Sequence, residues 1–247
     1  MIILNDKNLI KNRISLKQVS IADPSIVLYN QGIRSSLGIK ITKIVRDNTR
    51  LPKEIYEILI GLILGDGCLA KSNTSINAHA TRSQGLVHFS YSWQNFFLEK
   101  KILAFLCEST PDLSSSNRNG VINFKKRVRT RLYLCLTELY NIFYSNNKKV
   151  IPYDILFSLT PISLAYWAMD DGAKARPGFN APRSKAFTLE QVYSLVGILH
   201  YNFNLFCTNH VRDLKFPVIY ITARSMCTFR SLVTPYFHFR KFIYEFD

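Results

Sequence analysis

The sequence predicts an α+β fold made of two related halves around a central pair of helices. An apolar stretch that ends in Asp-Gly occurs twice, at residues 59–67 and again at 164–172. Strand-like segments and further amphipathic helices follow each stretch, so each half approximates an αββαββα order. The halves are therefore expected to be related by a pseudo-twofold axis, with the apolar helices at the centre and the antiparallel strands in a saddle.

Local signals set the expected elements of the first half. Pro52 suits the start of the first apolar helix, because its missing N–H is not needed there. The partial alternation at 86–91 is typical of a half-buried strand, and the apolar spacing at 93–107 is typical of a helix. The polar residues at 109–120 predict a loop, and a further helix is expected at 134–144.

The second half repeats this plan. Residues 160–161, Thr-Pro, predict an N-cap and a first helical position for the second apolar helix. Residues 188–191, Thr-Leu-Glu-Gln, form a capping box ahead of a helix with one apolar face. Two strands are expected at 211–215 and 217–222, and a closing helix at 225–233.

The chain divides into three expected regions. Residues 1–50 mix short apolar runs with Lys and Arg without a clean period, which predicts a basic N-terminal extension. Within it, 35–50 is either a basic arm that lies along nucleic acid or a solvated linker. Residues 51–150 and 151–247 are then the two repeated halves.

Small residues indicate that the two apolar helices pack side by side. Gly61 and Gly65 lie about one helical turn apart in the first stretch, as Ala165 and Ala168 do in the second. Small side chains at a contact let two helix backbones approach closely. The C-terminal ends of the two helices are therefore expected to meet.

Each apolar stretch ends on a carboxylate, Asp66 in the first and Asp171 in the second. A negative charge is unfavourable at the C-terminal end of a helix. Two such carboxylates close together are costly to keep ionised unless a divalent cation neutralises them. One Asp-Gly is explained more simply as a helix end, but two copies favour a duplicated functional unit. The pair is therefore predicted to bind a metal ion.

These two stretches resemble the paired LAGLIDADG motifs of single-chain homing endonucleases and related intron maturases. The match is loose in the apolar letters, and both copies keep the final Asp-Gly. The flanking residues 147–152 and 159–161 are also similar to family members from organelle introns. The resemblance covers roughly residues 52–246.

The resemblance implies a sequence-specific DNA endonuclease of homing type, a hydrolase that cleaves phosphodiester bonds at a long site with Mg²⁺. It makes Asp66 and Asp171 the acidic metal ligands and catalytic residues. Lys149 matches the basic residue before the second motif, where it would polarise water or stabilise the phosphorane charge. Asp170 is either a supporting group or a solvated one.

Several positions depart from the family pattern. Tyr91 and Lys185 stand where relatives commonly carry a Gln, and residues 244–246 read Tyr-Glu-Phe in place of Tyr-Lys-Leu. Lys241 is the nearest substitute for the second basic residue of the active site. These departures leave an alternative open, a non-cleaving RNA-binding protein of the same fold, either an intron maturase or a component of an organellar ribosome.

The charge points to a polyanionic partner. The formal net charge is +15 and the pI is about 9.7, while 47% apolar residues argue for a folded chain. Double-stranded DNA is the expected partner, with intron or ribosomal RNA as the alternative. No membrane association is expected, because no run of about eighteen apolar residues occurs.

The cysteines indicate a reducing compartment. Their number is five, and none forms a Cys-x-x-Cys pair, so neither a disulfide framework nor a zinc site is predicted. With the resemblance, this favours an organellar location, the mitochondrion ahead of the plastid. The internal repeat predicts a monomer with pseudo-symmetry.

Basic residues recur at every second position of one segment. On a strand, Lys125, Arg127, Arg129 and Arg131 would share one face, which suits phosphates in a groove. An exposed edge strand protected by charge is the structural alternative. Further basic residues after the two motifs complete the expected nucleic-acid surface: Lys71, Arg82, Lys174, Arg176, Arg183, Lys185 and Arg212.

Overall fold

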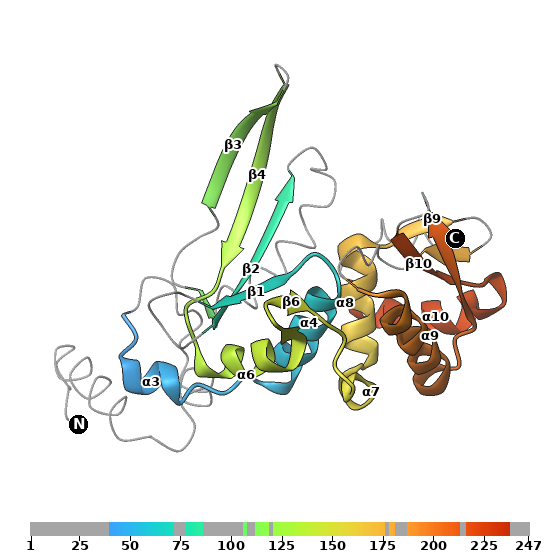
Figure 1. Ribbon diagram of the computed structural model, residues 1–247, viewed down its shortest axis with the longest axis horizontal. Coiled ribbons are helices and arrows are strands. Elements are labelled where there is room, and N and C mark those ends of the chain that lie inside the picture. The colour runs from blue at the N-terminus through green and yellow to red at the C-terminus, as the bar shows by residue number, and fades with distance from the viewer. Residues whose placement is uncertain are drawn as a thin grey trace, which may run out of the picture.

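A computed structural model shows two helices side by side at the centre, with a sheet above each half (Figure 1). The helices are α4 (Lys53–Leu64) and α8 (Pro161–Asp171), and they contain the two repeated apolar stretches. The α+β fold with two related halves is thus confirmed. The structure describes residues 40–71, 78–85, 106–107, 112–118, 121–175, 178–180, 187–212 and 216–237.

The first half carries an antiparallel four-stranded sheet in the order β1-β2-β4-β3. In Figure 1 the β3–β4 hairpin projects well beyond the helices. The helix expected at 134–144 is confirmed, and the strand at 86–91 lies outside the described residues, as does most of the helix at 93–107. The bounds are β1 (Cys68–Lys71), β2 (Ala78–Gly85), β3 (Asp112–Arg118), β4 (Val121–Arg129) and α6 (Leu134–Phe143).

The loop expected at 109–120 is wrong, because most of it is strand β3. Its sequence, Asp-Leu-Ser-Ser-Ser-Asn-Arg, consists mainly of turn-forming residues. The segment is nevertheless paired with β4 along its whole length, from Asp112 opposite Arg127 to Arg118 opposite Val121. Pairing with a neighbour has therefore overridden the local preference.

The second half repeats the arrangement with the strand order β7-β8-β10-β9. The two expected strands exist, but the first begins at Cys207 and ends at Arg212, earlier than 211–215. The closing helix at 225–233 is confirmed apart from its first residue. The bounds are β7 (Ala173–Ala175), β8 (Gly178–Asn180), α9 (Leu189–Phe203), β9 (Cys207–Arg212), β10 (Phe216–Ile221) and α10 (Met226–Val233).

Several short elements complete the fold. A hairpin of β5 (Tyr144–Ser145) and β6 (Lys148–Lys149) turns through Asn146 and Asn147, which both have positive φ. Asn tolerates this conformation better than most residues do. A short helix was not expected before the first half, yet α3 (Lys43–Asp47) is present. The remaining short helices are α7 (Ile155–Ser158), η2 (Ala223–Ser225) and η3 (Thr234–Tyr236).

The predicted helix caps are confirmed. The Thr160 side chain accepts a hydrogen bond from the N–H of Ser163, and Pro161 is the first residue of α8. At the start of α9, Thr188 and Gln191 bond reciprocally as a capping box. Each cap satisfies N–H groups that have no partner within the helix.

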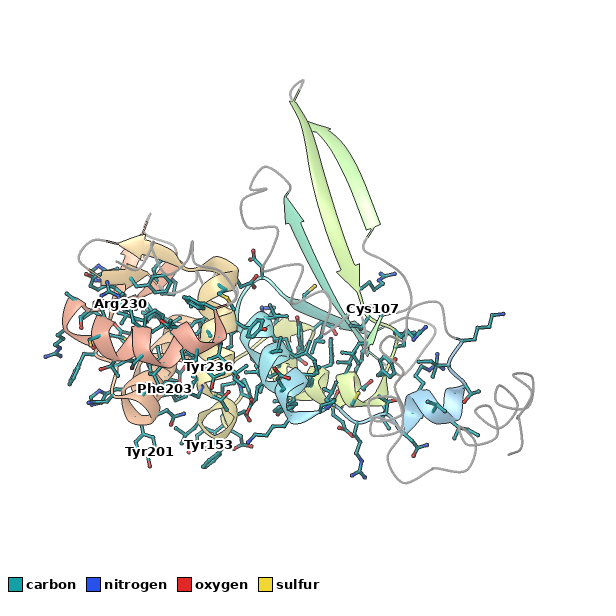
Figure 2. The ribbon with its side chains drawn as sticks, turned by 180° about the vertical axis from the view of Figure 1, so that it is seen from behind. Cys107, Tyr153, Tyr201, Phe203, Arg230 and Tyr236 are labelled. Atoms are coloured by element: carbon teal, nitrogen blue, oxygen red, sulfur yellow. The ribbon has the colours of Figure 1, made fainter. Side chains whose placement is uncertain are left out.

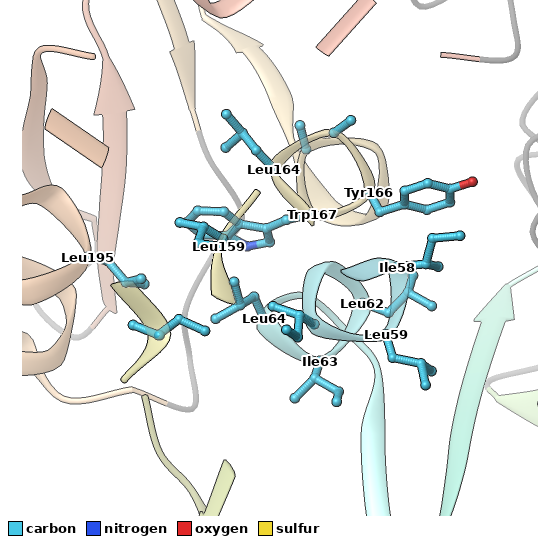
Figure 3. Packing of buried hydrophobic residues seen from close by; sticks show 14 of the residues in the cluster. Ile58, Leu59, Leu62, Ile63, Leu64, Leu159, Leu164, Tyr166, Trp167 and Leu195 are labelled. Atoms are coloured by element: carbon cyan, nitrogen blue, oxygen red, sulfur yellow. The ribbon is translucent and has the colours of Figure 1, made fainter. Parts of the chain in front are cut away.

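The hydrophobic core lies between the helices and the sheets, and strand residues such as Leu69, Phe179 and Ile219 take part in it. Seen from behind, the side chains gather between and around the helices (Figure 2). Near the centre, Trp167 is 1% exposed and lies beside Leu159 (Figure 3). Among the described residues, no helix is long and apolar enough to cross a membrane.

Candidate active site

The two motif helices approach closely at Gly61 and Gly65 of α4. The nearest residues of α8 are Ser163, Tyr166, Trp167 and Asp170, and not Ala165 and Ala168 as predicted. A Cβ atom added to Gly61 would lie 2.9 Å from Cβ of Tyr166 and 3.1 Å from the backbone nitrogen of Trp167. Across the same contact, the buried Ser163 hydroxyl donates to the carbonyl of Glu57 at 2.9 Å. The predicted side-by-side packing is thus confirmed, and it brings the C-terminal ends of the helices together.

The end of α4 is tied to the end of α8. Helix α4 stops at Leu64, and the N–H of Gly67 folds back to the carbonyl of Leu62 at 2.8 Å. Between them, the N–H of Asp66 donates to Oδ2 of Asp170 at 2.6 Å. A carboxylate from the second motif therefore holds the peptide of the acid in the first.

Lys149 reaches the same place from the β5–β6 hairpin. Its Nζ donates to the carbonyl of Gly65 at 2.8 Å and to the carbonyl of Gly67 at 3.0 Å. A cation is favourable here, because the carbonyls at a helix C-terminus carry partial negative charge. Lys149 thus bonds to the residues on both sides of Asp66.

Burial makes this amine unusual. Removal from water lowers the pKa of Lys149 to about 8, while the negative charges of Asp170 and Asp66 act in the opposite direction. The ammonium form still predominates at neutral pH, and a modest change in surroundings alters its charge. Perturbed groups of this kind are typical of functional sites.

The two predicted acids differ in what the structure describes. The Asp66 side chain is exposed at the end of its helix, and Asp171 is the last residue of α8. The side chain of Asp171 lies outside the description, so its approach to Asp66 stays a prediction. Sequence reasoning left the role of Asp170 open, since no local signal says which side chain crosses to the other helix.

The donors near Asp66 suit a hard divalent cation. Carboxylate and carbonyl oxygens are the ligands that Mg²⁺ prefers, and the exposed Asp66 carboxylate is free of steric cover. Within the described residues, no group of three or more His, Cys, Asp or Glu side chains gathers as a metal site. Cys68, two residues after Asp66, is also exposed.

Comparison with known proteins identifies the family of the chain. Residues 56–229 match the family model described as the LAGLIDADG DNA endonuclease family, and this range contains all of α8 and all but the first three residues of α4. The chain belongs to this family.

Its relatives carry two kinds of name. Cytochrome b mRNA maturase bI2 of Debaryomyces hansenii is 31% identical over 175 residues, which are 70% of this chain and 65% of the relative. Probable intron-encoded endonuclease 1 of Wickerhamomyces canadensis is 31% identical over 212 residues, 79% of this chain and 87% of the relative. The chain thus spans less than two thirds of the first relative's length.

A solved structure shares the fold across nearly the whole chain. The homing endonuclease I-WcaI, bound to its DNA recognition sequence, is 26% identical and superposes with a TM-score of 0.73. The similarity covers 91% of this chain and 97% of that one.

In this LAGLIDADG chain, the expected basic strand is β4, which begins before Lys125 and ends at Arg129. Lys125, Arg127 and Arg129 occupy alternate positions in it, but Arg131 lies beyond the strand end. Arg131 is half-buried, and its positive charge acts on the buried hydroxyl of Tyr133, where it partly offsets the rise in pKa caused by burial. The placement of Arg131 on the strand face is therefore wrong.

The other predicted nucleic-acid residues are spread over both sheets. Arg82 of β2 is paired with Val128 of β4. Its position in the register therefore alternates with the positions of the three basic residues of β4. The exposed Lys71 donates to Asn141 at 2.9 Å and lies over the ring of Tyr140. Lys174 is in β7 and Arg212 ends β9, and three residues lie outside the described part of the chain: Arg176, Arg183 and Lys185.

Proposed function

We propose that this chain is a sequence-specific DNA endonuclease of homing type, which hydrolyses phosphodiester bonds at a long site with Mg²⁺. The observation that carries the proposal is the hydrogen-bonded group of Asp66, Lys149 and Asp170 at the joined ends of the motif helices. Helix packing alone does not need a buried amine beside an exposed carboxylate. The family membership and the DNA-bound I-WcaI structure support the same reading.

Each residue has a role in this proposal. Asp66 and Asp171 hold the divalent ion, which supplies positive charge to the reacting phosphate when bound. Lys149 uses two of its three N–H donors on the carbonyls of Gly65 and Gly67, so that the third can donate to a phosphate oxygen or a water molecule.

The remaining parts of the proposal concern partners and place. The duplex lies across the two sheets, where phosphates meet the basic residues of β4 and its neighbours. The chain acts as a monomer, because its two halves already supply the paired helices. The intron-encoded relative supports an organellar location, which we propose to be the mitochondrion.

The enzyme is tested directly with DNA in which the two exons are joined without the intron that would encode the chain. With Mg²⁺, the parent is expected to produce cut ends at one position, and Asp66→Asn is expected to lose them while still binding the DNA. Asp154→Asn is the matched control, since Asp154 is an exposed carboxylate just ahead of α7. Equal cutting by Asp66→Asn and the parent would remove Asp66 from the active site.

The hairpin offers a sharper pair of variants for the amine. Lys149→Met removes the buried ammonium, whereas Lys148→Met changes its exposed neighbour in the same strand. We expect the first to lower kcat by a factor of about 10² and the second to leave it within a factor of about two. A similar loss in both variants would indicate a general effect of charge on DNA binding.

A maturase is the second candidate, favoured by the similarity to cytochrome b mRNA maturase bI2. In that case the chain binds an intron RNA and does not cut DNA. Pulldown of the chain from its native compartment, followed by RNA sequencing, separates the two. Enrichment of one intron or ribosomal RNA, with no cutting at high protein concentration, would replace the endonuclease proposal.

The basic strand is tested through salt dependence. Replacing Lys125, Arg127 and Arg129 together by Ala should weaken DNA binding and lower the slope of log Kd against log salt by about one unit per lost phosphate contact. Arg131 is left intact, because its contact with Tyr133 would confuse binding with stability. An unchanged slope would show that β4 does not contact phosphates.

A further inference from the structure

Asp170 of the second motif contacts the backbone of Asp66 in the first motif. Its Oδ2 atom accepts a hydrogen bond from the N–H of Asp66 at 2.6 Å, which is shorter than most N–H···O bonds. This N–H follows the end of α4, in a turn where the N–H of Gly67 bonds back to Leu62. The N–H of Asp66 therefore bonds to a side chain of the neighbouring helix and not to a carbonyl of its own turn.

Gly65 makes room for this contact. A Cβ atom added at Gly65 would lie 3.0 Å from both Cβ and Cγ of Asp170, which is closer than side chains normally approach. A glycine before Asp66 and a carboxylate before Asp171 therefore form a matched pair across the helix contact.

The arrangement occurs once in the pseudo-symmetric pair. The position equivalent to Asp170 in the first motif is Gly65, which has no side chain to return the bond. Helix α4 ends two residues before Asp66, whereas α8 continues to Asp171 itself. Asp66 therefore lies beyond the end of α4, and its N–H bonds to the other helix. Asp171 is the last residue of α8 itself.

We propose that Asp170 is a positioning residue for Asp66, which fixes the peptide of that acid from the opposite motif and so sets the direction of its carboxylate. The catalytic part of this inference rests on the proposed endonuclease function. The hydrogen bond itself does not, so the two can be tested separately.

Amide hydrogen exchange of ¹⁵N-labelled protein tests the bond without any cleavage. The N–H of Asp66 is expected to exchange at least about tenfold faster in Asp170→Ala than in the parent. Gly65→Ala should speed this exchange too, although it leaves Asp170 in the chain. Asp170→Asn keeps an acceptor oxygen and should retain most of the protection, and Asp154→Ala should change nothing.

Cleavage kinetics then test the positioning role. Asp170→Ala should lower the single-turnover rate by about tenfold or more with an unchanged Kd for DNA, because small displacements of a reacting group have large effects on rate. Asp170→Asn should recover most of that loss. An equally slow Asn variant would instead indicate that the charge, and not the bond, is what matters, and would overturn the proposal.

The outcomes are distinguishable even where a variant is unstable. If Asp170→Ala does not fold, Gly65→Ala and Asp170→Asn still compare a displaced acceptor with a retained one. Fast exchange of the Asp66 N–H in the parent would overturn the proposal outright. A protected N–H in a parent that cuts no DNA would overturn the endonuclease function and leave the hydrogen bond standing.

Discussion

The middle of the α4–α8 contact and the ends of the same two helices follow different rules. In the middle, the contact is buried and closely packed around Gly61, Ser163 and Trp167. At the ends, Asp66 is exposed, and Lys149 and Asp170 bond to peptides around it. The middle therefore serves stability, while the ends hold polar groups that a packing contact does not need.

The largest expected loss of stability comes from a substitution in the middle of the contact. Trp167→Ala removes a large side chain that is 1% exposed and should lower the free energy of unfolding by about 3–5 kcal/mol. Tyr201→Ala is the control, because this aromatic residue on α9 is 79% exposed and its loss should cost less than about 0.5 kcal/mol. Urea denaturation of both variants measures the difference.

A smaller effect comes from overfilling the same contact. Gly61→Ala places a methyl group against Tyr166 and the Trp167 backbone and should destabilise the fold by about 1–3 kcal/mol. Gly197→Ala makes the same chemical change in α9 where nothing lies within 4 Å, so better helix propensity should stabilise it by up to about 1 kcal/mol. Equal effects at both glycines would contradict the close helix contact.

The third prediction concerns pH and the helix ends. The pKa of Lys149 is about 8 in the folded chain, below its ordinary value of 10.5, so between these values the unfolded chain binds the extra proton. The Lys149 contribution to stability should therefore rise with pH through this window, by about 1.5 kcal/mol between roughly pH 8 and 9.5. Burial raises the pKa of the Cys135 and Cys207 thiols to about 12, so these two groups act in the opposite direction over the same window. Subtracting the plot of stability against pH measured for Lys149→Met removes the contributions of the buried tyrosines and cysteines, which both variants share. Identical plots for the parent and Lys149→Met would refute the prediction.

The smallest expected change in stability is that of a substitution at the helix ends. Asp66→Asn changes an exposed side chain and keeps the N–H that bonds to Asp170, so the free energy of unfolding should stay within about 0.5 kcal/mol of the parent. A loss comparable to that of Gly61→Ala would mean that the Asp66 carboxylate serves the packing of the helices.

The sequence alone determined the features that depend on neighbouring residues. The two motif helices, the cap at Thr160 and the capping box at Thr188 were predicted, and all are present. The same holds for the close approach of the two helices at the glycines of α4. These features follow from hydrophobic period and from side chains that bond within one turn, so a local reading suffices.

Only the tertiary structure decided the features that join distant residues. Strand β3 exists through its pairing with β4, against the turn preference of Ser114, Ser115 and Ser116. The bonds of Asp170 to Asp66 and of Lys149 to Gly65 depend on how two helices and a hairpin come together. No local sequence pattern predicts these bonds, because the two residues of each bond lie far apart in the chain. Only the packing of the helices and the hairpin brings them within bonding distance.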